Sequence, residues 1–118
     1  MHLDLLASDR SVSARWDPAP YQPIHDEDIL AQVEPLLGAA SVPATIVNWA
    51  GDEVVTVQEW CAAMGELLGR PARVETRPVP GTHRGLVADV SRRRALTGPC
   101  KVHWKDGIRR AAEARGLI

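Results

Sequence analysis

The feature that most constrains the fold is a short apolar run, Ala44–Trp49 (ATIVNW), bounded by Pro43 and Gly51. A run of this length and character is typical of a strand that is covered on both faces, as in a parallel α/β sheet. Such a strand needs neighbours on both sides, yet the remainder of the 118 residues supplies few further strands. The run therefore predicts that this chain forms the end of a larger sheet.

The other expected elements lie between prolines and glycines. The pattern Thr56-Val57-Gln58-Glu59 predicts a capping box that starts a helix, which Gly69 ends. Three acids predict the start of another helix over 26–37, which Pro35 should kink or shorten. Its predicted apolar stripe consists of Ile29, Leu30, Val33, Leu36 and Leu37. Further predicted elements are a helix tail over 2–7, strands over 11–16 and 73–79, and helices over 89–96 and 103–115. The alternation favours an α/β fold with a few strands, one of them buried and parallel near 44–49, and four to five helices.

Composition excludes several classes of protein. No run approaches about 18 apolar residues, so no membrane span is expected, and no signal peptide is recognisable. Cys61 and Cys100 are expected to be reduced thiols in a cytoplasmic protein, with Cys61 an inert core thiol, and neither is expected to be a catalytic nucleophile. The net charge of −1 divides into −9 over residues 1–69 and +8 over residues 70–118, which predicts that the two halves neutralise each other.

Few residues carry the signature of a chemical site. His25 and its neighbouring acids lack the ligand spacing of a metal site, so we expect none. The arginines of 92–94 point around a helix rather than along one stripe, which argues against nucleic-acid binding. Asn48 and Trp49 end the predicted strand, where α/β sheets bind ligands. Arg84 lies in a loop between Gly81 and Gly85, and a guanidinium suits a phosphate or carboxylate.

Three blocks of sequence carry a specific resemblance. Residues 23–29 (PIHDEDI) look like an "IHVDDxA" block, and residues 47–51 with 55–59 look like "YNVGxG…S(V/I)xE". Residues 89–98 with 104–109 look like a "DxSKxxxxLGW…(L/W)xEGL" ending. In this order and spacing, the chain resembles the C-terminal third of the extended short-chain dehydrogenase/reductase family, the NAD-dependent epimerases and dehydratases of nucleotide sugars.

The resemblance implies that residues 1–118 form a single partial domain. This domain would hold the substrate-side region together with the last strand and helix of a Rossmann-like sheet. The glycine fingerprint that binds the dinucleotide is absent, as is the catalytic Tyr-x-x-x-Lys pair. Tyr21 is the single tyrosine, and His25 stands where the lysine would be. We therefore expect no catalytic residue and no cofactor bound by this chain alone, although the full-length family uses NAD or NADP.

The same resemblance suggests a nucleotide sugar as ligand. Its expected contacts are Asn48, Trp49 and Arg84, with Arg77 and His83 in the region of the family's later substrate loop. Tyr21 occupies the position at which many members carry an arginine for a substrate phosphate. Two alternatives stay open. The chain could be a module that forms homo-oligomers or binds a protein through an exposed strand or helix face, or, less favoured by its charge, a nucleic-acid binder.

Overall fold

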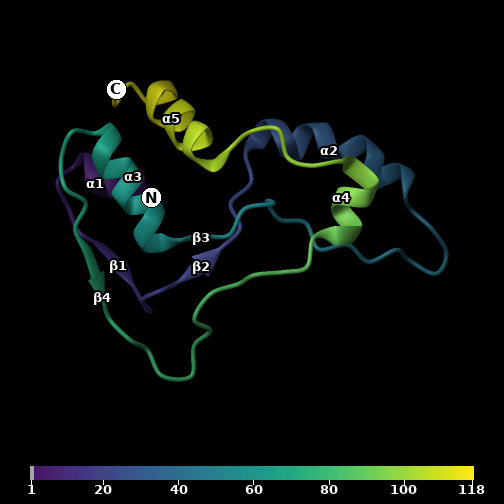
Figure 1. Cartoon of the computed structure of the whole chain (residues 1–118), viewed down its shortest axis with the longest axis horizontal. Helices are drawn as coiled ribbons and strands as arrows, with labels where there is room; N and C mark the ends of the chain where they lie inside the picture. Colours follow the sequence, from purple (N-terminus) through teal and green to yellow (C-terminus); the bar gives the residue numbers. More distant parts are fainter. Residues whose placement is uncertain (1) are drawn as a thin grey trace.

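The computed structural model describes residues 2–118 as nine short elements joined by long extended segments (Figure 1). The helices are α1 (His2–Ala7), α2 (Asp26–Gly38), α3 (Val57–Leu67), α4 (Ser91–Thr97) and α5 (Trp104–Ala114). The strands are β1 (Val12–Ala14), β2 (Pro20–Tyr21), β3 (Val55–Thr56) and β4 (Val74–Thr76). The chain is mixed α/β, as the sequence predicts.

The strands form two separate two-stranded sheets. β1 pairs with β4 in parallel, with Val12 opposite Val74. β2 pairs with β3 in the antiparallel sense, with Tyr21 opposite Val55. Neither sheet is large enough to bury both of its faces, so the core must form where helices cover them.

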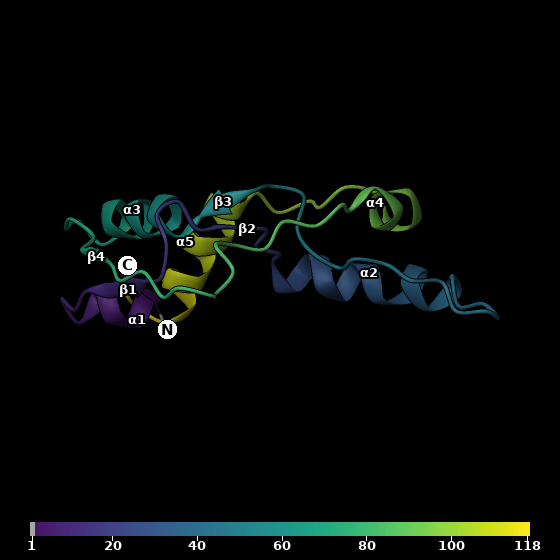
Figure 2. The ribbon, with the colours of Figure 1, turned by 90° about the horizontal axis from the view of Figure 1, so that it is seen from below.

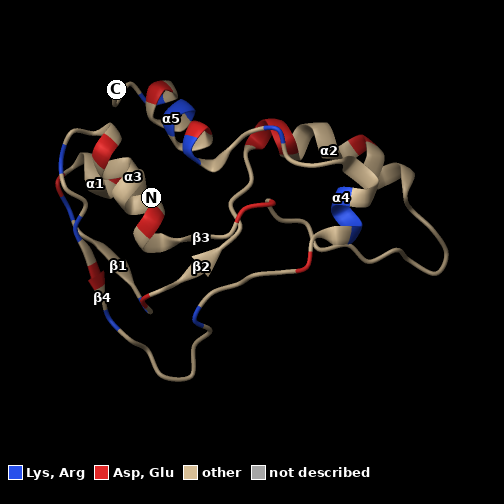
Figure 3. Cartoon of the chain, in the orientation of Figure 1, with Lys and Arg blue, Asp and Glu red and all other residues tan. Residues whose placement is uncertain are grey.

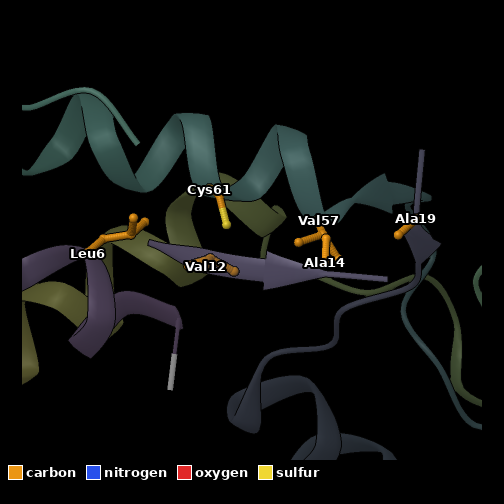
Figure 4. Packing of buried hydrophobic residues seen from close by; sticks show 6 residues of the cluster. All are labelled: Leu6, Val12, Ala14, Ala19, Val57 and Cys61. Atoms are coloured by element: carbon orange, nitrogen blue, oxygen red, sulfur yellow. The ribbon is translucent and has the colours of Figure 1, made fainter. Parts of the chain in front are cut away.

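The core lies between α1, α3 and β1. Cys61 on α3 points toward Val12 on β1, and both side chains are fully buried (Figure 4). The remaining buried members of this cluster are Leu6, Ala14, Ala19 and Val57. This small cluster holds α1, β1 and α3 together.

The start of α3 confirms the predicted capping box. Glu59 N donates to Thr56 Oγ1 at 3.1 Å, and Thr56 N donates to Glu59 Oε2 at 2.7 Å. The helix ends at Leu67 with Leu68 at its C-cap, and the predicted stop residue Gly69 follows with a φ of 66°, a conformation that glycine adopts readily. Local sequence therefore fixes both ends of this helix.

The predicted strand at 44–49 is wrong. No regular secondary structure forms there, and Ile46 is 77% exposed. The physical reason is the absence of a neighbour, because an extended segment becomes a strand only when another strand accepts its backbone hydrogen bonds. Among the described residues, no backbone–backbone hydrogen bond joins 41–50 to another segment.

The predicted apolar stripe of α2 is turned inward only in part, since Ile29 and Leu36 are half-buried and the other three members are exposed. Leu30 and Leu37 are 74% and 71% exposed, whereas Asp28 and Gln32 are buried. The helix turns its polar side inward because Asp28 accepts hydrogen bonds from the backbone N–H groups of Lys101 and Val102. Pro35 does not end the helix, which continues to Gly38.

The other helix boundaries are close to those expected. α4 begins at Ser91 with Val90 at its N-cap, and Asp89 accepts a hydrogen bond from Ser91 N instead of capping an earlier start. α5 begins after His103, whose Nδ1 accepts from Lys105 N.

The molecule is flat. Its principal extents are 49 × 37 × 16 Å, and its radius of gyration is 16.3 Å (Figure 2). A compact domain of about 100 residues has a radius of gyration of about 13 Å. α2 and α4 form an arm that extends away from the core, and they contact each other.

Candidate functional site

Three extended segments meet beside β2. They are residues 20–22, residues 48–51 and residues 84–89, and we call them together the three-segment strip. The side chain of Gln22 joins all three, since Nε2 donates to Gly51 O at 3.2 Å and Oε1 accepts from Ala88 N at 2.7 Å. Asn48 Nδ2 adds a bond to Asp89 O at 3.0 Å. The strip is therefore a connected structure rather than a set of independent loops.

Two glycines allow the segments of the strip to approach so closely. A Cβ atom on Gly51 would lie 1.8 Å from Pro23 O, and one on Gly85 would lie 2.3 Å from Pro20 O. Neither contact is sterically possible, so any side chain would separate the segments. The glycine in the "YNVGxG"-like block thus has a packing reason in this chain.

Asn48, Trp49 and Arg84 lie on the strip or at its end. Trp49 is 46% exposed, and its Nε1 donates to Gln32 Oε1 on α2 at 2.9 Å. The guanidinium of Arg84 lies over the ring of Trp16, 4.5 Å from the ring centroid. The arginine is exposed but held in place by this cation–π contact.

Of the other predicted substrate residues, Tyr21 belongs to the first segment of the strip but turns its ring toward the core, and Arg77 and His83 lie outside the strip. Tyr21 packs against Trp60 with ring centroids 5.9 Å apart, so its ring belongs to the border of the core. Arg77 pairs with Glu75 of β4 at 2.7 Å. His83 is exposed in the loop before Arg84. Asn48 and Trp49 thus lie near Asp89 and α2, whereas Arg84 lies at the other end of the 84–89 segment beside Trp16, and Arg77 is outside the strip.

Sequence reasoning missed Gln22. It stands in a proline-rich segment where no motif singles it out, and its role depends on residues far along the chain. The available signal was its amide, which can donate and accept at once and so join two backbones.

A second missed group lies between α4 and the loop after the strip. Arg93 is fully buried and donates to Asp52 Oδ1 and to Gly98 O, the latter at 2.9 Å. Asp52 Oδ2 accepts from Cys100 N at 2.7 Å. Burial alone would raise the pKa of Asp52, but the hydrogen bond from Cys100 and the Arg93 guanidinium hold that pKa below its usual range. This cluster fastens α4 to the strip and is too enclosed to receive a ligand.

The helix N-termini do not fit a dinucleotide cofactor. A pyrophosphate needs free backbone N–H groups at the start of a helix. At α3 these groups are satisfied by the capping box, and at α2 Glu27 N donates to His25 Nδ1 beside three acids. At α5, Trp104 N donates to a carboxylate oxygen of Glu53. The N–H groups of Glu27, Glu59 and Trp104 at the starts of α2, α3 and α5 are thus already engaged, and the acids of α2 disfavour an anion there.

The side chains of α5 border a cavity of about 610 Å³ that faces α1 and α3. Trp60, Met64, Trp104 and Ile108 contribute apolar walls. None of the six predicted substrate residues lines it, so the cavity is separate from the strip.

The cysteines and the potential metal ligands of residues 2–118 form no further candidate site. Both cysteines are free, and burial raises the pKa of the Cys61 thiol to about 11, which agrees with the expectation that it is unreactive. No group of three or more metal-ligating side chains gathers within this range. Within the same range, no helix is both long and apolar enough to cross a bilayer.

Comparison with known proteins shows the fold. No protein-family model matches this sequence, and no curated protein matches it. Solved structures of nucleotide-sugar epimerases do match. The UDP-glucuronic acid 4-epimerase of Bacillus cereus, in complex with UDP-glucuronic acid and NAD, superposes with a TM-score of 0.75 at 17% identity. That match covers 91% of this chain and 35% of the epimerase.

Two further structures agree. The UDP-glucose 4-epimerase of Thermotoga maritima, with UDP-glucose, gives a TM-score of 0.78 at 15% identity over 99% of this chain and 39% of its own. MoeE5, in complex with UDP-glucuronic acid and NAD, gives 0.74 at 20% identity over 100% of this chain and 42% of its own. The chain thus spans well under half the length of these structures. It has the fold of one portion of a UDP-sugar epimerase, which confirms the resemblance at the level of the fold.

Proposed function

We propose that this chain is the substrate-side portion of a nucleotide-sugar epimerase- or dehydratase-like protein and that it is not catalytic alone. The observation that carries the proposal is the three-segment strip, in which the exposed side chains of Asn48, Trp49 and Arg84 are held by contacts with α2, Trp16 and Asp89. An amide, an indole and a guanidinium are groups that recognise a sugar, a base and a diphosphate. The fold match to epimerases that hold UDP sugars supports the same ligand class.

The test is thermal unfolding of the purified chain with and without UDP-glucose or UDP-glucuronic acid. A ligand that binds only the folded state raises the midpoint, by an amount that grows with the logarithm of one plus the ratio of its concentration to Kd. We expect millimolar UDP sugar to raise the midpoint and NAD to leave it unchanged. Arg84→Ala should abolish the rise, whereas Arg10→Ala, at an exposed arginine in the turn after α1, should preserve it. Absence of a shift with either UDP sugar contradicts the proposal.

An alternative is favoured by the exposure of Leu30, Leu37 and Ile46. Apolar side chains exposed together on one surface are typical of protein–protein contact. On this alternative the chain is an oligomerisation or protein-binding module. Light scattering tests the oligomerisation module, because a chain of that kind forms a dimer or larger assembly in the absence of any sugar nucleotide.

Nucleic-acid binding is the least supported alternative. Arg93, the middle residue of the arginine run, is fully buried against Asp52, so the run presents no continuous basic stripe. Figure 3 shows basic residues on α4 and acidic residues at the start of α2, the helix that α4 contacts. Acidic neighbours of this kind disfavour the approach of a phosphate backbone.

A further inference from the structure

We propose that the cavity between α1, α3 and α5 is a second binding site, whose ligand is an uncharged, planar aromatic molecule that carries a carbonyl group. The cavity has a volume of about 610 Å³. Small-molecule sites in proteins measure about 300–1,000 Å³ and combine mainly apolar walls with a few polar groups. None of the six residues expected to bind a nucleotide sugar lines this cavity, so the inference goes beyond the proposed function and does not depend on it.

The walls of the cavity favour a planar aromatic ligand. Trp60 and Met64 contribute to them from α3, and Trp104 and Ile108 contribute from α5. An indole packs well against a second aromatic ring, either offset-stacked or edge to face, and a thioether also makes favourable contacts with a ring. A flat apolar molecule between these side chains displaces water from apolar surface, and this displacement favours binding.

The space for such a ligand comes from small residues on one side of α5. They are Gly107, Ala111 and Ala114, which all line the cavity and follow the i, i+4, i+7 spacing of one helix face. On a helix that packs tightly against its neighbours, this face would carry large apolar side chains. Between the larger side chains of Trp104 and Ile108, the small residues leave the helix surface recessed.

The charged groups at the cavity rim favour an uncharged ligand. Arg110 Nη1 lies 2.8 Å from Glu27 Oε2 at the start of α2, and Arg115 pairs with Asp4 of α1. Both arginines therefore already have a carboxylate partner, and Asp26 adds a further acid to the lining. An anionic ligand would have to displace these partners and approach Asp26, which is unfavourable. The two ion pairs also join α5 to the neighbouring helices.

The polar groups of the lining favour a hydrogen-bond acceptor in the ligand. His25 Nδ1 accepts from Glu27 N at 3.2 Å, so the neutral imidazole carries its proton on Nε2. His2 Nδ1 accepts from Trp60 Nε1 at 2.9 Å, and burial lowers the pKa of His2, which favours the same neutral form. Within residues 2–118, neither His25 Nε2 nor Trp104 Nε1 has an acceptor. A carbonyl oxygen supplies an acceptor without adding charge.

The experiment is a titration of the isotope-labelled chain with coumarin, an uncharged planar bicyclic molecule with one carbonyl group. The indole N–H cross-peaks in the NMR spectrum report on it, because Trp60 and Trp104 line the cavity whereas Trp16 and Trp49 do not. We expect millimolar coumarin to shift the first two cross-peaks and to leave the other two in place. Naphthalene, which lacks the carbonyl, and a carboxylated coumarin, which adds a negative charge, should each bind about threefold more weakly or worse.

Ala111→Phe and Ala40→Phe form a matched pair of variants. Ala111 lines the cavity, whereas Ala40 is exposed after the end of α2 and does not line it. A phenylalanine at position 111 occupies the space of the ligand and should abolish the coumarin shifts, and Ala40→Phe should leave the affinity for coumarin unchanged. Circular dichroism shows whether both variants fold. If Ala111→Phe does not, the pattern of shifted indoles in the parent chain decides.

Three results overturn the inference: no shift of Trp60 and Trp104 with millimolar coumarin, equal shifts of all four indoles, or naphthalene that binds as tightly as coumarin. Movement of the Trp60 and Trp104 cross-peaks on dilution of the chain alone overturns it in favour of a second copy that covers the cavity. Competition between UDP-glucose and coumarin would show one site instead of two. If UDP sugars fail to bind while the coumarin shifts persist, the substrate proposal fails and the cavity site stands.

Discussion

Arg93 shows how a charged residue becomes part of the interior. It lies in a run of three arginines, yet it is the one member of the run that is buried. Its guanidinium donates to Asp52, to the Thr97 hydroxyl and to the Gly98 carbonyl. An ion pair in such a place stabilises only while both partners are present, since either charge alone is costly to bury.

Asp52→Asn should therefore lower the free energy of unfolding by about 3 kcal/mol at neutral pH, because it leaves the Arg93 charge without its partner. Urea unfolding measures this change. Asp106→Asn, which removes an exposed partner of Arg109, is the matched control and should cost under about 1 kcal/mol.

The same pair predicts a pH dependence. The pKa of Asp52 is lower in the folded state than in the unfolded state, where it is about 3.9. Its contribution to stability is therefore complete above the unfolded pKa and is lost as the pH falls through the folded pKa. The difference between parent and Asp52→Asn should shrink below about pH 4. A difference that stays constant down to pH 2 would show that the charge is not the source of the stability.

The two thiols should differ in reactivity. Cys61 is fully buried with a pKa of about 11, whereas Cys100 is partly exposed beside Gln32. At pH 8, iodoacetamide should modify Cys100 first and Cys61 only after unfolding in urea, since the thiolate is the reactive form. Mass spectrometry of the peptides decides this, and early modification of Cys61 would contradict the buried core.

Among the helices, local sequence signals fix where a helix begins and ends, whereas tertiary contacts decide which of its faces is buried. The capping box of α3 is a purely local signal, and Thr56→Ala should cost about 1 kcal/mol of stability, whereas Thr56→Ser should cost little. Thermal or urea unfolding of the two variants is the measurement. Equal losses for alanine and serine would show that packing of the threonine methyl group, rather than the cap, is responsible.

α2 gives the opposite case, in which tertiary contacts override the helix pattern. Asp28→Ala should cost about 2 kcal/mol, because it leaves the N–H groups of Lys101 and Val102 without an acceptor. Leu30→Ala should change stability by less than about 0.5 kcal/mol, since the leucine is 74% exposed. If the leucine variant is the more damaging one in the free chain, the apolar face is covered in solution.

At the scale of the whole molecule, the flat shape follows from how few apolar side chains are buried. The core cluster lies at one end, whereas α2, α4 and residues 41–50 form an arm held largely by polar contacts. Small-angle X-ray scattering of the free chain should give a radius of gyration near 16.3 Å, and light scattering should give a monomer. A value near 13 Å would show that the arm folds back and covers its own apolar face.

The sequence by itself determined the elements whose causes are local: the capping box at Thr56, the glycine end of α3, the acidic start of α2 and the alternation that favours α/β. It also carried the three blocks by which the epimerase fold could be predicted. The positions of Asn48, Trp49 and Arg84 on one strip, the linking role of Gln22 and the buried Arg93–Asp52 pair were decided only by the tertiary structure. The hydrogen bonds of Gln22, Asn48 and the Arg93–Asp52 pair join residues that lie between 29 and 66 positions apart in the sequence. Residues 44–49 show the physical reason most plainly. The apolar run has the composition of a strand, but a strand forms only where a second backbone pairs with it through hydrogen bonds.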